Sequence, residues 1–173
     1  HKREIWAKVL DSREKRGLPY LFFTDNVNKN KPEIYKIKEK HIEASNLCTE
    51  IMLPYSDDES FVCCLSSMNL ENYDDWKDTD AVEAIVYLLD AVITEYIDKA
   101  AMYPDLVKTV NFSSRHRAIG IGALGWHSYL QKKSIPFDDI QAVFLTGDIF
   151  KDIQAQATKV SQDMVQVHGY ERP

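Results

Sequence analysis

The sequence predicts an α/β fold with parallel strands. Short apolar runs typical of buried strands alternate along the chain with helical segments, which favours strands joined by helical crossovers. Of the 173 residues, 45% are apolar and 28% are charged, the composition of a globular protein with a substantial core. No internal repeat, low-complexity tract or domain linker is visible, so we expect one domain or a piece of one.

The N-terminal part is predicted to hold a helix, a strand and a loop. Apolar residues at helical spacing predict a helix over residues 3–16, which Gly17 ends. The apolar and aromatic run 18–24 predicts a strand that is buried on both faces. Residues 25–40 are polar and contain Pro32, and this composition predicts a loop.

Extended segments follow. Residues 44–53 alternate with the period of an extended chain, so that alternate side chains share one side. An acidic turn is predicted over residues 55–60, and a further strand over residues 61–66.

A long amphipathic helix is predicted next. Asp78 or Thr79 can cap it, and it runs to about Ala101. Its core stripe consists of Val82, Ile85, Val86, Leu89, Val92, Ile93, Tyr96 and Ile97. Pro104 separates this helix from a short helix that extends to about Phe112.

The C-terminal part repeats the strand-to-helix alternation. A small strand, interrupted by glycines, is predicted over residues 118–124, and a short helix over residues 126–133. Asp138 or Asp139 starts a final helix that reaches Val167.

Charge and composition exclude several classes of protein. The net charge of −6 and the pI near 5.4 argue against direct nucleic-acid binding, which usually needs a basic face. No apolar run of about 18 residues predicts a membrane span, and the charged start does not resemble a signal peptide. Three cysteines are too few for a disulfide scaffold, so we expect a cytoplasmic protein in a reducing environment.

The segment around Cys48 is the most informative for chemistry. In an extended segment, Asn46, Cys48 and Glu50 project to one side, so a hydrogen-bond donor, a thiol and a carboxylate face one ligand. An apolar core would not select asparagine and glutamate at these positions. The alternative is an edge strand with a solvated polar face and an incidental cysteine.

The adjacent pair Cys63 and Cys64 is the second feature. Neighbouring residues on a strand point to opposite faces, so only one of these thiols can face the same cavity as Cys48. The alternative is two buried structural cysteines. We expect no metal site, because the sequence has no Cys-x-x-Cys motif and its five histidines are scattered.

A glycine-rich run from Gly120 to Gly125 matches the dinucleotide-binding fingerprint Gly-x-Gly-x-x-Gly. Its context does not fit, because no second strand ending in an acidic residue follows at the required distance. Close packing of a strand backbone against a helix explains these glycines better, and binding of a nucleotide cofactor is the alternative.

Four segments resemble the large, catalytic subunit of class I ribonucleotide reductase, in the order of that family and along nearly the whole chain. They are GLPYLFFTD (residues 17–25), ASNLCTEI (residues 44–51), CCLSSMNL (residues 63–70) and RAIGIGALGWHSYL (residues 117–130). The resemblance implies that residues 1–173 form a single partial segment of a ten-stranded α/β barrel, with the finger loop that carries the radical cysteine. The N-terminal nucleotide-sensing region and the C-terminal part of the barrel are expected to lie outside this sequence.

The resemblance also assigns roles to individual residues. It implies that Cys48 is the radical cysteine, that Asn46 and Glu50 are its catalytic companions, and that Ser45, Asn46 and Glu50 bind the substrate. Cys63 matches one member of the reducing cysteine pair, whereas Cys64 is expected to be a core residue or a bystander. The implied activity is the thiyl-radical reduction of ribonucleoside diphosphates to deoxyribonucleotides for DNA synthesis.

Partners follow from the same resemblance. They are a ribonucleotide, the remaining large-subunit segments or a split-subunit partner, a radical-generating small subunit that contains metal, and thioredoxin or glutaredoxin. We expect no cofactor on this chain itself and expect nucleotide effectors to bind parts outside it. We expect the chain to be active only when the remaining large-subunit segments complete it. Because the second reducing cysteine has no counterpart here, a non-catalytic assembly or binding module that retains the fold is the alternative function.

Overall fold

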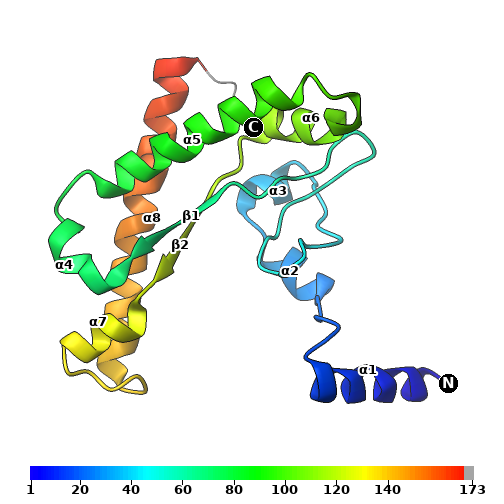
Figure 1. Ribbon diagram of the computed structural model, residues 1–173, viewed down its shortest axis with the longest axis horizontal. Coiled ribbons are helices and arrows are strands. Elements are labelled where there is room, and N and C mark those ends of the chain that lie inside the picture. Colours follow the sequence, from blue (N-terminus) through cyan, green and yellow to red (C-terminus); the bar gives the residue numbers. More distant parts are fainter. Residues whose placement is uncertain (170–173) are drawn as a thin grey trace. The chain divides into compact units, whose positions relative to one another are not determined.

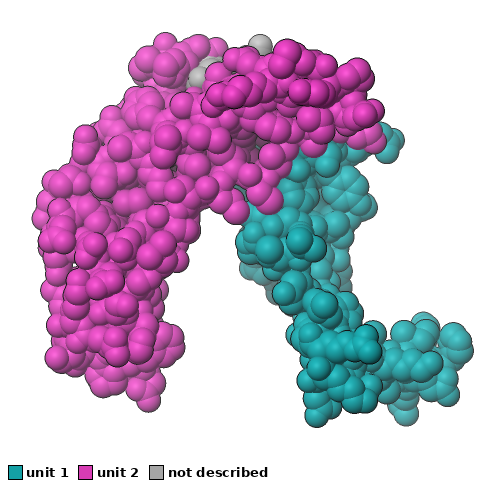
Figure 2. All heavy atoms as spheres, in the orientation of Figure 1, with its two compact units in different colours: residues 1–61 teal, residues 62–173 magenta. Residues whose placement is uncertain are grey.

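The computed structural model describes residues 1–169, and the chain divides into two compact units (Figures 1 and 2). The first unit comprises residues 1–61 and the second residues 62–173. The first carries short helices and loops, and the second carries the sheet and the long helices (Figure 1).

The first unit contains the helices α1 (Lys2–Arg16), α2 (Thr24–Asn30) and α3 (Glu33–Ile37). The predicted N-terminal helix is confirmed, and Gly17 ends it in the left-handed conformation, with φ of 72°. The apolar stripe of this helix does not form a core, because none of its residues is buried. Ile42, Pro54 and Glu59 are the buried residues of the unit.

The predicted strand at residues 18–24 is wrong. These residues have no regular structure up to Thr24, which begins α2, and the side chains of Leu18, Tyr20 and Phe23 are exposed. A strand needs a neighbour for its backbone N–H and C=O groups. No strand of the described residues pairs with this run, so an apolar composition alone does not make it a strand.

The predicted loop at residues 25–40 is also wrong, because α2 and α3 occupy most of it. Pro32 is the residue that leads into α3, a position that proline tolerates because it needs no N–H donor there. The Asn28 side chain ties α2 to the following chain: its amide donates to the carbonyl of Ile42 at 2.7 Å, and its Oδ1 accepts from the Ile42 N–H at 3.0 Å.

The second unit is built on two parallel strands, β1 (Leu65–Asn69) and β2 (Gly120–Leu124), which confirms the parallel pairing expected from the sequence. Leu65 pairs with Gly120 and Asn69 with Leu124. The predicted strand at residues 61–66 is therefore displaced toward the C-terminus, since the regular pairing starts where β2 supplies a partner. These two strands form the only sheet within residues 1–169.

Two long helices, α5 (Ala81–Ala100) and α8 (Ile140–His168), supply most of the core of the second unit (Figure 1). Both match the predicted helices. Their buried side chains contact residues of the sheet in three apolar clusters. These side chains are Val82, Val86, Leu89 and Ile93 of α5 and Ile149, Ile153, Val160 and Met164 of α8.

The predicted helix starts are close to the observed ones. Asp139 caps α8, because its carboxylate accepts from the Gln141 N–H at 2.8 Å. Thr79 Oγ1 accepts from the N–H of Ala81 at 3.3 Å, at the start of α5. Val92 of the predicted stripe is exposed, so the buried face of α5 is narrower than expected.

Short elements complete the second unit. They are η1 (Leu70–Asn72), α4 (Tyr73–Trp76), η2 (Pro104–Leu106), α6 (Val107–His116) and α7 (Trp126–Lys132). Arg117, which follows α6, binds α5 through a largely buried ion pair: its Nε donates to Asp90 Oδ1 at 2.8 Å, and its Nη2 donates to the Asp90 carbonyl at 3.0 Å. This pair fixes the chain just before β2.

Candidate active site

Residues 45–51 of the first unit form a closed turn rather than the predicted extended segment. The N–H of Thr49 donates to the carbonyl of Asn46 at 3.1 Å, the hydrogen bond of a β-turn. Leu47 and Cys48 are the central residues of this turn, and both are exposed; the side chain of Leu47 is 91% accessible. The thiol of Cys48 is therefore carried at the tip of a loop.

Side-chain bonds join the two arms of the turn. Asn46 Nδ2 donates to Glu50 Oε1 at 2.7 Å, and Asn46 Oδ1 accepts from the N–H of Ile51 at 3.1 Å. Ser45 Oγ donates to the carbonyl of Ile51 at 2.6 Å and lies 3.2 Å from Asn46 Oδ1. The hydroxyl of Ser45 is thus used within the loop, and an amide and a carboxylate meet beside the cysteine.

The prediction of an extended segment is wrong, but the expectation that Asn46 and Glu50 lie on one side of the chain remains valid. In a regular strand, Asn46 and Glu50 would lie on one side with their Cα atoms about 13 Å apart, too far for a hydrogen bond. The turn closes that distance. Asparagine at the first position of a turn is the signal that could have predicted it, although the alternating pattern concealed it.

No role was predicted for Thr49 from the sequence. Its φ is +67°, which places a β-branched residue in the left-handed region that favours glycine. No sequence pattern around it predicts this conformation.

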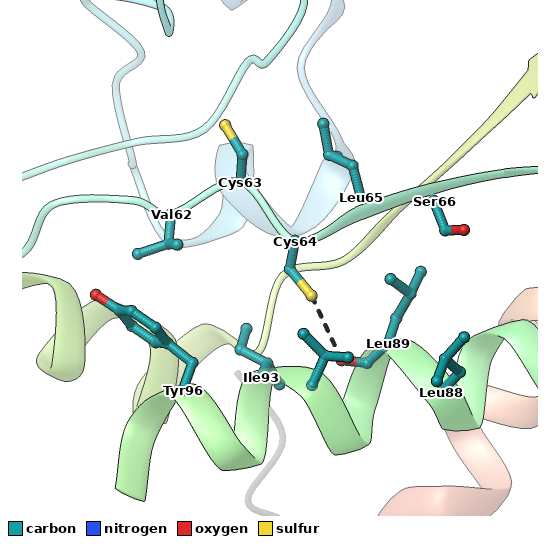
Figure 3. Close-up of a pocket in the computed structure, with 10 residues that line it drawn as sticks. Val62, Cys63, Cys64, Leu65, Ser66, Leu88, Leu89, Ile93 and Tyr96 are labelled. Carbon is teal, nitrogen blue, oxygen red and sulfur yellow. Dashed lines mark hydrogen bonds between the residues drawn. The ribbon is translucent and has the colours of Figure 1, made fainter. Parts of the chain in front are cut away.

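Cys63 and Cys64 belong to the second unit and precede β1. Figure 3 shows their side chains pointing in opposite directions, Cys64 toward α5 and Cys63 away from it. Cys64 is buried, and its thiol lies 3.4 Å from the carbonyl of Leu89, to which it donates. Cys63 is exposed. The prediction that adjacent cysteines face opposite sides is confirmed, as is the expectation that Cys64 is a core residue.

The environment of Cys64 makes it a poor nucleophile. Burial raises the pKa of its thiol, the Asp90 carboxylate raises that pKa further, and the Arg117 guanidinium opposes the increase. An open hollow of about 310 Å³ lies between residues 62–66 and α5, and none of the residues that line it is charged. Only the thiolate is reactive, so this apolar surrounding protects Cys64.

We expect alkylation to distinguish the adjacent thiols. Brief treatment of the folded chain with iodoacetamide should modify Cys48 and Cys63 at least about tenfold faster than Cys64, because Cys64 is buried and its pKa is raised. Tandem mass spectrometry of the peptide that contains both neighbours measures this difference. In urea, Cys63 and Cys64 should react at similar rates. Equal labelling of Cys63 and Cys64 in the folded chain contradicts the assignment of Cys64 to the core.

The glycine run serves strand packing. A Cβ on Gly120 would lie 2.5 Å from Leu65 Cδ2, and one on Gly122 would lie 2.8 Å from Ser67 Oγ. Gly125, with φ of +74°, precedes α7 and approaches the backbone of Glu71. Side chains at Gly120 and Gly122 would have to displace the side-chain ends of Leu65 and Ser67, whereas one at Gly125 would meet backbone. Close packing of this run is confirmed, but at Gly120 and Gly122 the neighbour is the strand β1 and not a helix as expected.

Within residues 1–169, no group of three or more His, Cys, Asp or Glu side chains is arranged to hold a metal ion. None of the helices in this range has the length and apolar character needed to cross a bilayer.

A parallel β–α–β unit defines an α/β fold, and Cys48 on its closed turn is the candidate site of the chain. Comparison with known proteins assigns the family. The family model for the ribonucleotide reductase barrel domain matches residues 1–172. The chain belongs to this family, as the resemblance noted in the sequence implied.

Individual relatives agree with the family model. The large subunit assigned to ribonucleoside-diphosphate reductase in Frog virus 3 (isolate Goorha) is 44% identical over 168 residues, covering 96% of this chain and 30% of that protein. The large subunit of the same enzyme from Invertebrate iridescent virus 3 is 35% identical, covering 96% of this chain and 26% of that protein.

A solved structure is similar as well. The class Id ribonucleotide reductase alpha subunit of Actinobacillus ureae is 53% identical, with a TM-score of 0.91 over 95% of this chain and 32% of that chain. The chain thus spans about a quarter to a third of the length of these relatives.

Proposed function

We propose that this chain is the active-site segment of a ribonucleoside-diphosphate reductase large subunit, and that it reduces ribonucleotides once the rest of a ten-stranded barrel completes it. The observation that carries the proposal is the bond between Asn46 and Glu50 beside Cys48 at the tip of a closed turn. In this proposal, residues 45–51 are the finger loop of the barrel.

The thiol of Cys48 suits hydrogen abstraction. The S–H bond is close in strength to the 3′ C–H bond of a ribose, so a thiyl at Cys48 removes that hydrogen reversibly. A radical-generating small subunit, which contains metal, would create the thiyl. An exposed position at a loop tip gives the sulfur access to a sugar.

Glu50 and Asn46 act on the same sugar. The Glu50 carboxylate accepts the proton of the 3′-hydroxyl as a general base, while the Asn46 amide orients the ribose by hydrogen bonding. The bond between their side chains supports this division, because it keeps the carboxylate next to the amide. Ser45 supports the loop by its bond to the Ile51 carbonyl and contributes at the edge of the substrate site.

Reduction needs two electrons, and thiols supply them. The 2′-hydroxyl takes a proton from one of two thiols and leaves as water. Cys63 and a second cysteine outside this chain give up two electrons in all and form a disulfide, their second proton goes to C2′, and Glu50 returns its proton to the 3′-oxygen. The 3′ hydrogen then returns from Cys48, which restores the thiyl. Thioredoxin or glutaredoxin would reopen the disulfide. The outward direction of the Cys63 side chain supports this role for Cys63 over Cys64 (Figure 3).

Replacing Glu50 with glutamine in the assembled enzyme tests the proposal. We expect kcat for reduction of a ribonucleoside diphosphate to fall about 10²- to 10⁴-fold, because the amide cannot accept the hydroxyl proton. Steady-state assays with thioredoxin as reductant measure this loss.

The matched control is Glu43→Gln. Glu43 is an exposed carboxylate of the same unit that accepts a hydrogen bond from the hydroxyl of Tyr55 at 3.0 Å, outside the turn. This variant should retain wild-type activity. If Glu50→Gln is as active as Glu43→Gln, Glu50 is not the base.

A non-catalytic assembly or binding module is the second candidate, because Cys64, the thiol next to Cys63, is buried and points the opposite way, so it cannot serve as the reducing partner of Cys63 (Figure 3). In that case, the chain would associate with other large-subunit segments, but the assembly would not turn over any ribonucleotide. Co-purification without turnover supports this alternative.

A further inference from the structure

We propose that Thr49 is a positioning residue of this site, and that its left-handed backbone, rather than its side chain, holds Glu50 against Asn46. The inference rests on the proposed function, since it explains how the turn holds the Glu50 carboxylate in place for catalysis.

The conformation of Thr49 is unusual for its residue type. A β-branched residue at φ of +67° is disfavoured, because its Cβ crowds the neighbouring backbone. Such conformations persist only where the surrounding structure requires them, and they concentrate at functional sites.

Comparison with the other left-handed residues separates Thr49 from them. Among residues 1–169, the remaining non-glycine residues with positive φ are Glu39, Arg117 and Ser134. Each of these lies at the C-terminal end of a helix, where a left-handed residue commonly ends the helix. Thr49 follows no helix, so ending a helix does not explain its conformation.

The bonds across the turn indicate what the conformation achieves. The turn at Leu47 and Cys48 reverses the chain, and the left-handed φ of Thr49 directs Glu50 and Ile51 back beside Asn46. There, Glu50 Oε1 and the Ile51 N–H both bind the Asn46 amide group. The bond from Ser45 Oγ to the Ile51 carbonyl closes the same pair of arms. With Thr49 in an extended conformation, the chain would continue away from Asn46, and these three bonds would be lost together.

Three substitutions at Thr49 in the assembled enzyme test the proposal. Thr49→Val keeps the β-branched shape and removes the hydroxyl, whereas Thr49→Asn introduces a residue that tolerates the left-handed region. Both should retain kcat within about twofold if the side chain has no direct role. Thr49→Pro fixes φ near −65° and also removes the N–H that donates to the Asn46 carbonyl, so both backbone features of Thr49 are lost. It should lower kcat about 100-fold, the scale of loss from a misplaced reacting group.

A double-mutant cycle identifies the group through which Thr49 acts. If Thr49 positions Glu50, the proline substitution should cost less than about threefold in a Glu50→Gln background, because no carboxylate remains to be misplaced. Proline also restrains Cys48, the residue before it. An effect transmitted through Cys48, or a general loss of structure, would instead retain the full 100-fold cost in that background.

Each outcome bears on the inference. The role of Thr49 is disproved if the Thr49→Pro enzyme is active, or if Thr49→Val is as impaired as Thr49→Pro. It is also disproved if the proline substitution lowers kcat by the full 100-fold in the Glu50→Gln background. Glu50→Gln in the same assay keeps the proposals separate. If Glu50→Gln is fully active, the proposed function fails. If it is impaired while Thr49→Pro is active, only the role of Thr49 fails.

Discussion

Replacing Cys48 with serine is expected to abolish ribonucleotide reduction by the assembled enzyme, with a loss of at least about 10³-fold, the scale seen when an essential reacting group is removed. The O–H bond of serine is much stronger than the S–H bond, so no radical that can abstract the ribose hydrogen forms at position 48. The side chain at the loop tip is exposed, so serine fits there and the Asn46–Glu50 bond should remain. Turnover of a ribonucleoside diphosphate by the reconstituted enzyme measures the effect.

Cys64→Ala provides the control for this experiment. It also removes one thiol, but that thiol is buried against α5 and bonded to the Leu89 carbonyl. The control variant should retain most of the turnover, with a modest loss of stability. Wild-type turnover by Cys48→Ser would disprove the central role of this cysteine.

Replacing Gly125 with alanine is expected to lower the free energy of unfolding by about 3 kcal/mol, the sum of a left-handed alanine and an overpacked contact. The new Cβ would lie 2.5 Å from Asn69 Oδ1 and 2.9 Å from the backbone N of Glu71. The backbone nitrogen of Glu71 cannot move aside as the end of a flexible side chain would. Urea unfolding, followed by tryptophan fluorescence, measures the loss, since Trp76 and Trp126 pack against the nearby core cluster.

Gly147→Ala is the matched control. Gly147 lies inside α8, and a Cβ there would have no atom within 4 Å. Alanine should therefore raise the stability by about 0.5–1 kcal/mol, the usual difference between the two residues in a helix interior. Equal effects of the two substitutions would contradict the packing role of Gly125. Saturable binding of NAD or FAD, lost in Gly125→Ala, would instead favour the cofactor interpretation of the glycine run.

The helices of the second unit could be predicted from the sequence because their main determinants are local. The stripe on α5 has a helical period, and the cap at Asp139 adjoins the helix that it starts, so each signal can be read from a short stretch of sequence. The strand at residues 120–124 was also predictable, because its glycines allow a neighbouring chain to approach closely.

The first unit was predicted less well because its structure depends on contacts between segments. The apolar run 18–24 resembles a strand, but it lacks a pairing partner within the described residues. Polar residues 25–37 form two helices, the first of which Asn28 fixes by two bonds to the backbone of Ile42, fourteen positions away. Composition does not encode such a contact.

The sequence by itself determined the family, the residue types of the site and the opposite directions of Cys63 and Cys64, because motif spacing and the alternation of a strand are local properties. Only the tertiary structure decided that residues 45–51 close into a turn and that Asn46 binds Glu50. It also decided the left-handed conformation of Thr49. The physical reason is that hydrogen bonds across the turn outweigh the backbone preference of a β-branched residue, and an alternating pattern contains no trace of that balance.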